Sequence, residues 1–131
     1  MVSEKNNIEF KWNSNFPINS LNIMRGYISI SKDKQHDYLN CFFDAYWKNN
    51  KDLTNSENIS KLLSSLKIDS EVFFKSIKEQ SIKDQSIKDK LINLTTEAFQ
   101  KEVFGTPTFI INNKIFWGQD RLEYAIEEFN N

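Results

Sequence analysis

The chain has 131 residues with 11 Phe among them, and its 17 basic and 18 acidic side chains leave a net charge of −1. This length is typical of one domain, and the balanced charge offers no basic surface for nucleic acid. No apolar run approaches the ~20 residues of a membrane span, and residues 1–7 lack the apolar core of a signal peptide. We therefore expect a cytoplasmic protein that binds neither nucleic acid nor membrane.

A single cysteine and a single histidine limit the chemistry of the chain. Cys41 alone forms no intramolecular disulfide and no Cys-x-x-Cys motif. It lies in an aromatic helix stripe, and we interpret it as a small buried or half-buried residue rather than a reactive thiol. His36 lies at a solvated helix start and cannot build a metal site without partners. The sequence predicts no metal site.

The predicted elements begin with an extended segment over residues 1–15. Ile8, Phe10 and Trp12 alternate with charged residues, which is typical of a short strand or an extended tail. A helical domain is predicted over residues 16–101, with Pro17 at the entry of its first helix. An aromatic stripe follows in the next helix, formed by Tyr38, Leu39, Phe42, Phe43, Tyr46 and Trp47.

Polar residues mark the starts of two later helices. Thr54-x-x-Glu57 has the spacing of a capping box. The next helix is expected to open at Asp69 or Ser70 and to bury one apolar face, made of Val72, Phe73 and Ile77.

A perfect tandem repeat, QSIKDQSIKD, occupies residues 80–89. Five residues turn a helix face by about 140°. Ile82 and Ile87 therefore cannot lie in one stripe, so we expect the first copy to be loop or frayed helix and the second copy to start the next helix.

At Gly105 the apolar period changes from helical to strand-like, and residues 102–131 are predicted as a ββα unit. The sequence predicts a strand over 108–111, a tight turn at Asn112-Asn113 and a returning strand over 114–117. Asp120-x-x-Glu123 is expected to cap a final helix. Because the first strand is apolar on both faces, we expect burial on both sides in a larger sheet.

Two features of this unit have the chemistry of a binding site. Most X–Pro bonds are trans, but a cis bond before Pro107 would turn the Thr106 backbone outward to pair with an extended peptide. Free N–H groups around Gln119 and Asp120 favour an anion. The Asp120 carboxylate favours an ammonium group, so this corner suits the α-amino, α-carboxylate end of an amino acid. The alternative is that Asp120 only caps the helix.

The segment FGTPTFIINNKIFWGQDRLEY closely resembles the C-terminal motif of the 2-hydroxychromene-2-carboxylate isomerase family, kin to kappa-class glutathione transferases and DsbA-like thioredoxin-fold proteins. FPINSLNIMRG and FFDAYWKNNKDLTN resemble the helical region of that family, in the same order. The resemblance covers residues 16 to 129. It implies an α+β, mostly helical chain, with a helical insertion domain followed by the C-terminal ββα half of a thioredoxin-like fold.

The resemblance also implies a cofactor and a reaction. The cofactor is glutathione, with Pro107 as a cis proline, the Thr106 backbone on the cysteinyl part, and Gln119 and Asp120 at the γ-glutamyl end. Asn19 would line the pocket for an aromatic substrate. The family reaction is the glutathione-assisted interconversion of 2-hydroxychromene-2-carboxylate and an open-chain benzylidenepyruvate.

The chain departs from the family at its start. Family members begin with a βαβ unit and a Ser-Pro loop, and we expect this unit to be absent, so no catalytic residue is predicted. Ser14 is an alternative for the family serine, but Phe16-Pro17-x-Asn19 matches the start of the helical insertion better.

The alternative function is a non-catalytic truncated or split fragment that forms a homodimer or pairs with a complementary chain through its free sheet edge. A disulfide oxidoreductase is disfavoured because the Cys pair is absent.

Overall fold

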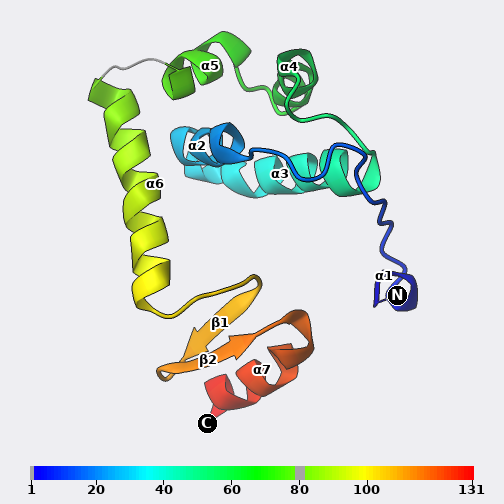
Figure 1. Cartoon of the computed structure of the whole chain (residues 1–131), viewed down its shortest axis with the longest axis vertical. Coiled ribbons are helices and arrows are strands. Elements are labelled where there is room, and N and C mark those ends of the chain that lie inside the picture. The colour runs from blue at the N-terminus through cyan, green and yellow to red at the C-terminus, as the bar shows by residue number, and fades with distance from the viewer. Residues whose placement is uncertain (1, 79–81) are drawn as a thin grey trace. The chain divides into compact units, whose positions relative to one another are not determined.

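The computed structural model describes residues 2–78 and 82–131, and it divides into two compact units, Met1–Leu91 and Ile92–Asn131 (Figure 1). Each unit is described by itself. The domain boundary proposed from the sequence, between residues 101 and 102, lies within the second unit. Within the described ranges, no helix is both long and apolar enough to cross a bilayer.

Short helices joined by polar turns make up the first unit. They are α1 (Val2–Lys5), α2 (Leu21–Ser29), α3 (Lys32–Phe43), a π-helical segment (Asp44–Lys48), α4 (Ser56–Ser65) and α5 (Ser70–Lys78), followed by α6 (Ile82–Gln100), which continues into the second unit. Helix α1 lies in the segment predicted as extended. Of the two alternatives for the stretch around Phe10, the strand is not observed, because residues 8–13 have no regular secondary structure and pair with no strand among the described residues.

The first long helix starts later than the sequence predicts. Pro17 follows a cis peptide bond and lies outside α2, which begins at Leu21. The Asn19 Oδ1 atom accepts the Leu21 N–H at 3.0 Å, so the side chain two residues upstream satisfies the first helical N–H. The prediction of Pro17 at a helix entry is therefore wrong.

The core of the first unit lies where α2, α3, α4 and α5 pack together. Its buried residues are Tyr38, Phe42, Ala45, Tyr46, Leu53, Ile59, Leu63, Phe73 and Ile77. The predicted aromatic stripe is only partly buried, since Phe43 is 61% exposed beside the buried Phe42. Val72, also expected in the core, is 65% exposed. Cys41 is half-buried, as predicted.

Gly26 lets α2 and α5 approach closely. A Cβ atom at this position would collide with the Phe73 ring and would lie 2.9 Å from the Tyr38 hydroxyl. That hydroxyl donates to the Ile23 carbonyl of α2 at 3.0 Å. Burial is the main cause that raises the pKa of Tyr38 far above its ordinary value, so the phenol keeps its proton and donates this bond.

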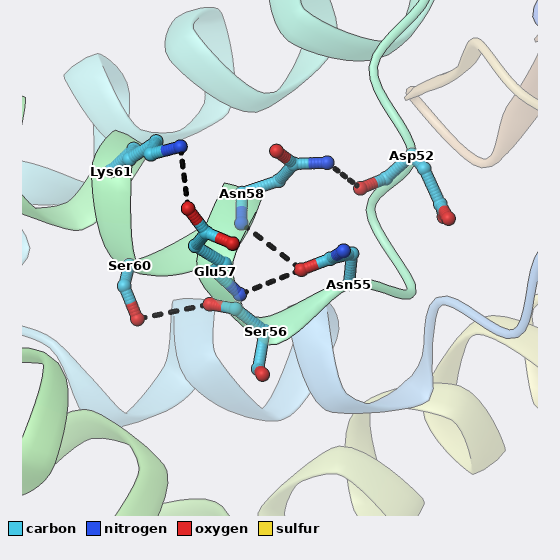
Figure 2. Close-up of polar contacts among 7 residues, drawn as sticks. All are labelled: Asp52, Asn55, Ser56, Glu57, Asn58, Ser60 and Lys61. Carbon is cyan, nitrogen blue, oxygen red and sulfur yellow. Dashed lines mark hydrogen bonds and ion pairs between the residues drawn. The ribbon is translucent and has the colours of Figure 1, made fainter.

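Helix α4 is capped by Asn55, one residue after the predicted Thr54 (Figure 2). The Asn55 Oδ1 atom accepts the N–H groups of Glu57 and Asn58, at 2.8 and 3.4 Å. Thr54 instead donates its hydroxyl to Asp52 at 2.6 Å, so it is not free to cap.

The cap of α5 matches the sequence. The Asp69 carboxylate accepts the N–H groups of Glu71 and Val72 at 2.8 and 3.0 Å. Helix α6 begins at Ile82, so the end of the first repeat copy is already helical, and the expectation that helix begins only in the second copy is wrong. The remainder of the first copy, residues 80 and 81, lies outside the described residues.

Hydrogen bonds of the buried Asn13 side chain connect the irregular N-terminal segment to the π-helical segment. Asn13 is 1% exposed, and its Nδ2 atom donates to the carbonyls of Tyr46 and Lys51 at 2.8 and 3.0 Å. Its Oδ1 atom accepts the Asn15 N–H at 2.8 Å. One buried amide thus satisfies a carbonyl in the last turn of the π-helical segment, where backbone acceptors lack intrahelical partners, and a second carbonyl in the loop that follows.

The second unit contains an antiparallel hairpin of β1 (Thr108–Ile111) and β2 (Lys114–Trp117), then a 3₁₀ turn (Gln119–Arg121) and α7 (Leu122–Asn130). Asn112 and Asn113 have φ angles of 50° and 61°, which suits a two-residue hairpin turn. Both strands and the turn are as predicted.

Helix α7 packs on the hairpin and buries Ala125. Burial of β1 on both faces is not observed, because Ile110 is 41% exposed in the two-stranded sheet that the described residues form. The predicted fold class, mostly helical α+β, is confirmed.

We expect Asn13→Ala to lower the free energy of unfolding by about 2–3 kcal/mol, because it leaves two carbonyls without their donor in a buried site. Asn13→Asp keeps the shape but removes both donors, so it should cost at least as much. Asn15→Ala, which keeps the backbone N–H that Asn13 accepts, is the matched control. Urea titration followed by circular dichroism measures all three, and a wild-type midpoint for Asn13→Asp would contradict this role.

Candidate functional site

Four of the predicted site residues meet at one corner of the second unit. The Gly118 N–H donates to the Pro107 carbonyl at 2.9 Å. This bond joins the segment that enters β1, with Thr106 and Pro107, to the segment that enters α7, with Gln119 and Asp120. We call these four residues the polar corner.

Thr106 is exposed and precedes β1 by two residues. Its peptide bond to Pro107 is cis. No hydrogen bond to its N–H or C=O occurs among the described residues, whereas neighbouring Thr108 donates its hydroxyl to the Gly105 carbonyl at 2.6 Å. The Thr106 backbone therefore has a donor and an acceptor available for an extended peptide.

Asp120 does not cap α7, so the predicted capping box is wrong. A 3₁₀ turn separates Asp120 from the helix, and the N-cap residue of α7 is Arg121, which makes no side-chain cap bond. The Asp120 side chain is 72% exposed, and its contact with the Arg121 Nε atom, at 3.6 Å, is a weak surface pair. A carboxylate that caps nothing remains available to a cationic group.

Gly118 fixes the geometry between the two segments of the corner. Its φ and ψ angles are 101° and 152°, a region that residues with a side chain rarely adopt. A Cβ atom there would also lie 2.5 Å from the Asp120 Oδ1 atom. The glycine thus allows both the turn and the position of the carboxylate.

Two exposed aromatic rings beside the corner were not identified from the sequence. Phe104 and Trp117 are 72% and 52% exposed, and their ring centroids lie 5.1 Å apart. Trp117 faces Thr108 across the hairpin. The position of Trp117 at the end of the predicted returning strand could have indicated an exposed aromatic surface, but the sequence analysis interpreted Trp117 only as part of that strand.

Asn19 and Ser14 belong to the first unit. Asn19 is exposed, its amide oxygen accepts the Leu21 N–H, and it borders a cavity of about 310 Å³ with Thr54, Phe74 and Lys78. The Ser14 hydroxyl contacts the Asn50 Oδ1 atom at 3.1 Å. The role of Asn19 in substrate binding stays a prediction.

His36 contacts a residue of its own helix, and Cys41 contacts a residue of α4. The His36 Nε2 atom lies 3.1 Å from the Asn40 side-chain nitrogen, and the Cys41 Sγ atom lies 3.9 Å from the Ser65 hydroxyl. Among residues 2–78 and 82–131, no group of three or more His, Cys, Asp or Glu side chains is placed to hold a metal ion.

A ββα unit that follows a set of helices is the arrangement expected for the C-terminal half of a thioredoxin-like fold. Comparison with known proteins identifies the family. The family profile of the DSBA-like thioredoxin domain matches residues 1–129, so the chain belongs to this family. A stretch of 29 residues is 48% identical to the 2-hydroxychromene-2-carboxylate isomerase of Sphingobium xenophagum and covers 22% of this chain and 15% of that protein.

A solved structure of a 2-hydroxychromene-2-carboxylate isomerase superposes with a TM-score of 0.80 at 20% sequence identity. The match covers 98% of this chain and 60% of that one. The resemblance stated from the sequence motifs is confirmed, and the chain spans about 60% of the length of that solved isomerase.

A network of polar contacts ties the hairpin turn to α7, at the end of the hairpin away from the polar corner. Glu128, with 17% of its side chain exposed, accepts hydrogen bonds from Lys114 at 2.6 Å and from the Asn112 amide at 3.0 Å. The hydrogen bond from Lys114, and next that from Asn112, lowers the pKa of Glu128 below its ordinary value. The stability that ionised Glu128 gives the folded state is therefore fully present above its unfolded-state pKa, about 4.3. This stability is lost as the pH falls through the lower folded-state pKa of Glu128.

We expect the hairpin amides of the wild type to lose protection against hydrogen exchange as the pH falls below the ordinary Glu pKa of about 4.3, because protonation of Glu128 weakens its contacts with Lys114 and Asn112. Glu128→Gln should remove most of this dependence, because glutamine still accepts hydrogen bonds but does not titrate. The exposed Glu127→Gln is the matched control and should behave as the wild type. An equally steep loss in Glu128→Gln would contradict the assignment.

Gly118→Ala should destabilise the second unit by about 1–3 kcal/mol, because alanine is strained at this backbone conformation. The measurement is urea unfolding at pH 7 followed by Trp117 fluorescence in a Trp12→Phe, Trp47→Phe background, with Gln119→Ala as a neighbouring control. An unchanged midpoint for Gly118→Ala would show that the turn adopts another conformation in solution.

Proposed function

We propose that this chain supplies the glutathione-binding corner of a glutathione-dependent isomerase of the 2-hydroxychromene-2-carboxylate isomerase type, acting on aromatic or conjugated carboxylates. The observation that carries the proposal is the polar corner, where the backbone hydrogen bond from Gly118 to Pro107 joins the segment with the unpaired Thr106 backbone to the segment with the exposed Asp120 carboxylate. Membership of the DSBA-like family and the likeness to isomerases of this type support it.

The chemistry of the corner fits glutathione. The γ-glutamyl end of glutathione carries an ammonium and a carboxylate. The Asp120 carboxylate would pair with the ammonium, and the Gln119 amide together with the N–H groups before α7 would bind the carboxylate. The Thr106 N–H and C=O would pair with the cysteinyl backbone, as in strand addition.

Bound glutathione would supply a thiol nucleophile that adds reversibly to a conjugated substrate and allows rotation about a former double bond. The corner residues of this chain would bind and orient it. None of the four is proposed to transfer a proton, and the activity of the whole protein stays a proposal.

Self-association or pairing with a complementary chain is a further expectation that we keep as a proposal. Each strand of the hairpin has one edge without a partner strand among the described residues, and such edges favour pairing between chains. Light scattering at several concentrations would measure it, and a strict monomer at all concentrations would contradict it.

Asp120→Asn should weaken glutathione binding about fivefold to tenfold, because it removes a charge-assisted bond to the γ-glutamyl ammonium. The measurement is an NMR titration of the full chain followed at the amides of the corner. Cysteinylglycine, which lacks the γ-glutamyl group, should bind wild type and variant equally, and the exposed Glu123→Gln is the matched charge control. Glutathione at tens of millimolar tests roughly the weakest affinity that such a titration detects. If it changes the NMR shift of no amide in the polar corner, the proposal fails.

A further inference from the structure

The first unit contains a cavity of about 310 Å³ whose lining combines polar and apolar residues. It lies among the start of α2, the first turn of α4 and α5, and its polar lining residues are Asn19, Asn22, Thr54, Ser56 and Lys78. We call it the lysine cavity, because Lys78 is the one charged side chain among the described residues that line it.

The lysine cavity has an apolar floor and a polar rim. Leu53, Ile59, Phe73 and Ile77 line it and are buried in the core of the first unit. The five polar lining residues are all exposed. A ligand that enters from solvent can therefore reach both kinds of surface, and its apolar part is removed from water when it binds.

Lys78 supplies a positive charge that no acidic residue of the described lining offsets. Its Nζ atom lies 5.3 Å from the centre of the Phe74 ring, which also lines the cavity, and this is the range of a cation–π contact. Lys78 makes no hydrogen bond or ion pair with another described residue. The contact with Phe74 keeps the ammonium at the cavity and leaves its N–H donors available to an anion.

Two further features of the rim favour an anion over a cation. The Asn22 amide makes no hydrogen bond with another described residue, so its N–H donors are available. Ser56 is the first residue of α4, so the positive end of that helix dipole lies at the rim. Thr54 is not counted among the donors, because its hydroxyl already binds Asp52 at 2.6 Å.

We propose that the lysine cavity binds a small monocarboxylate, whose carboxylate pairs with the Lys78 ammonium and the Asn22 amide and whose apolar body covers the floor. A charge-assisted hydrogen bond is stronger than a neutral one, so the carboxylate determines the orientation. One cation suits a single negative charge better than the two charges of a phosphate ester, which would lose hydration and gain fewer partners. A cavity of about 150 Å³ holds benzene, so the observed volume admits a six-membered ring together with its carboxylate.

This inference does not rest on the proposed function. All the residues that line the lysine cavity lie in the first unit, whereas the polar corner lies in the second. Lys78 and Asn22, which carry the inference, were not identified from the sequence. The carboxylate is recognised by residues of the cavity alone, so its binding can be measured in the absence of glutathione.

The test compares phenylacetate with its neutral isostere phenylacetamide, and with acetate, which lacks the apolar body. The measurement is an NMR titration of the full chain without glutathione, at pH 7 and low ionic strength, followed at the amides of Asn22, Ser56 and Ile77. We expect phenylacetate to bind about threefold to fivefold more tightly than phenylacetamide, as one exposed ion pair allows. Acetate should bind at least about tenfold more weakly than phenylacetate, because it buries no ring.

Lys78→Met should abolish the preference for phenylacetate over phenylacetamide, because methionine keeps an apolar stem and removes the charge. Its phenylacetamide binding should match that of the wild type, which separates a loss of the ion pair from a folding defect. Lys78→Arg should keep the preference. Lys32→Met, which removes one exposed positive charge outside the cavity, is the matched control and should behave as the wild type.

Equal affinity of the wild type for phenylacetate and phenylacetamide would overturn the proposal. So would a Lys78→Met variant that keeps the preference, or shifts confined to amides outside the lining. The absence of any shift with phenylacetate at tens of millimolar, roughly the weakest affinity that the titration detects, would overturn it as well. None of these outcomes bears on glutathione binding at the polar corner, so each proposal can fail without the other.

Discussion

The hydrogen bond from the Gly118 N–H to the Pro107 carbonyl is the constraint on which the second unit depends. At 2.9 Å it brings two loop segments together beyond the end of the hairpin. Without it, the free backbone of Thr106 and the carboxylate of Asp120 would belong to separate loops, and neither alone recognises a peptide with a charged amino end. The contacts of Glu128 with Asn112 and Lys114 act at the opposite end of the same hairpin. The first contact closes the open end of the hairpin, and the Glu128 contacts tie its turn to α7.

The first unit depends on a comparable constraint of a different kind. The buried amide of Asn13 satisfies carbonyls at the end of the π-helical segment and so allows the N-terminal segment to cover it. Phe10 stacks on Trp47 with ring centroids 5.6 Å apart, and Trp12 and Phe16 pack around the same indole. The hydrogen bonds of Asn13 and the surrounding aromatic rings thus hold the N-terminal segment against the π-helical segment, although residues 8–13 have no regular secondary structure.

Sequence reasoning succeeded where the signal is local. The Asn112-Asn113 turn, both strands and the Asp69 cap depend on side chains within a few residues, and all were predicted. It failed where neighbouring residues compete for one role: Asp52 binds the Thr54 hydroxyl and leaves the α4 cap to Asn55, and a 3₁₀ turn displaces Asp120 from the α7 cap. The π-helical segment was not predicted. The buried Asn13 that binds its Tyr46 carbonyl lies 33 residues away in sequence, so no pattern within the segment indicates this contact.

The polar corner and the apolar cavity of the first unit, whose lining includes Phe16, Met24 and Trp47, differ in how they treat charge. At the polar corner Asp120 is solvent-exposed, so a charged group that pairs with it keeps part of its hydration. No Lys, Arg, Asp, Glu or His side chain lines the cavity, so a carboxylate there would lose hydration without gaining a partner. A molecule with both a carboxylate and a ring system would therefore place only its rings against such a lining. Selectivity in this chain would arise from the exclusion of charge at one site and the pairing of charge at the other.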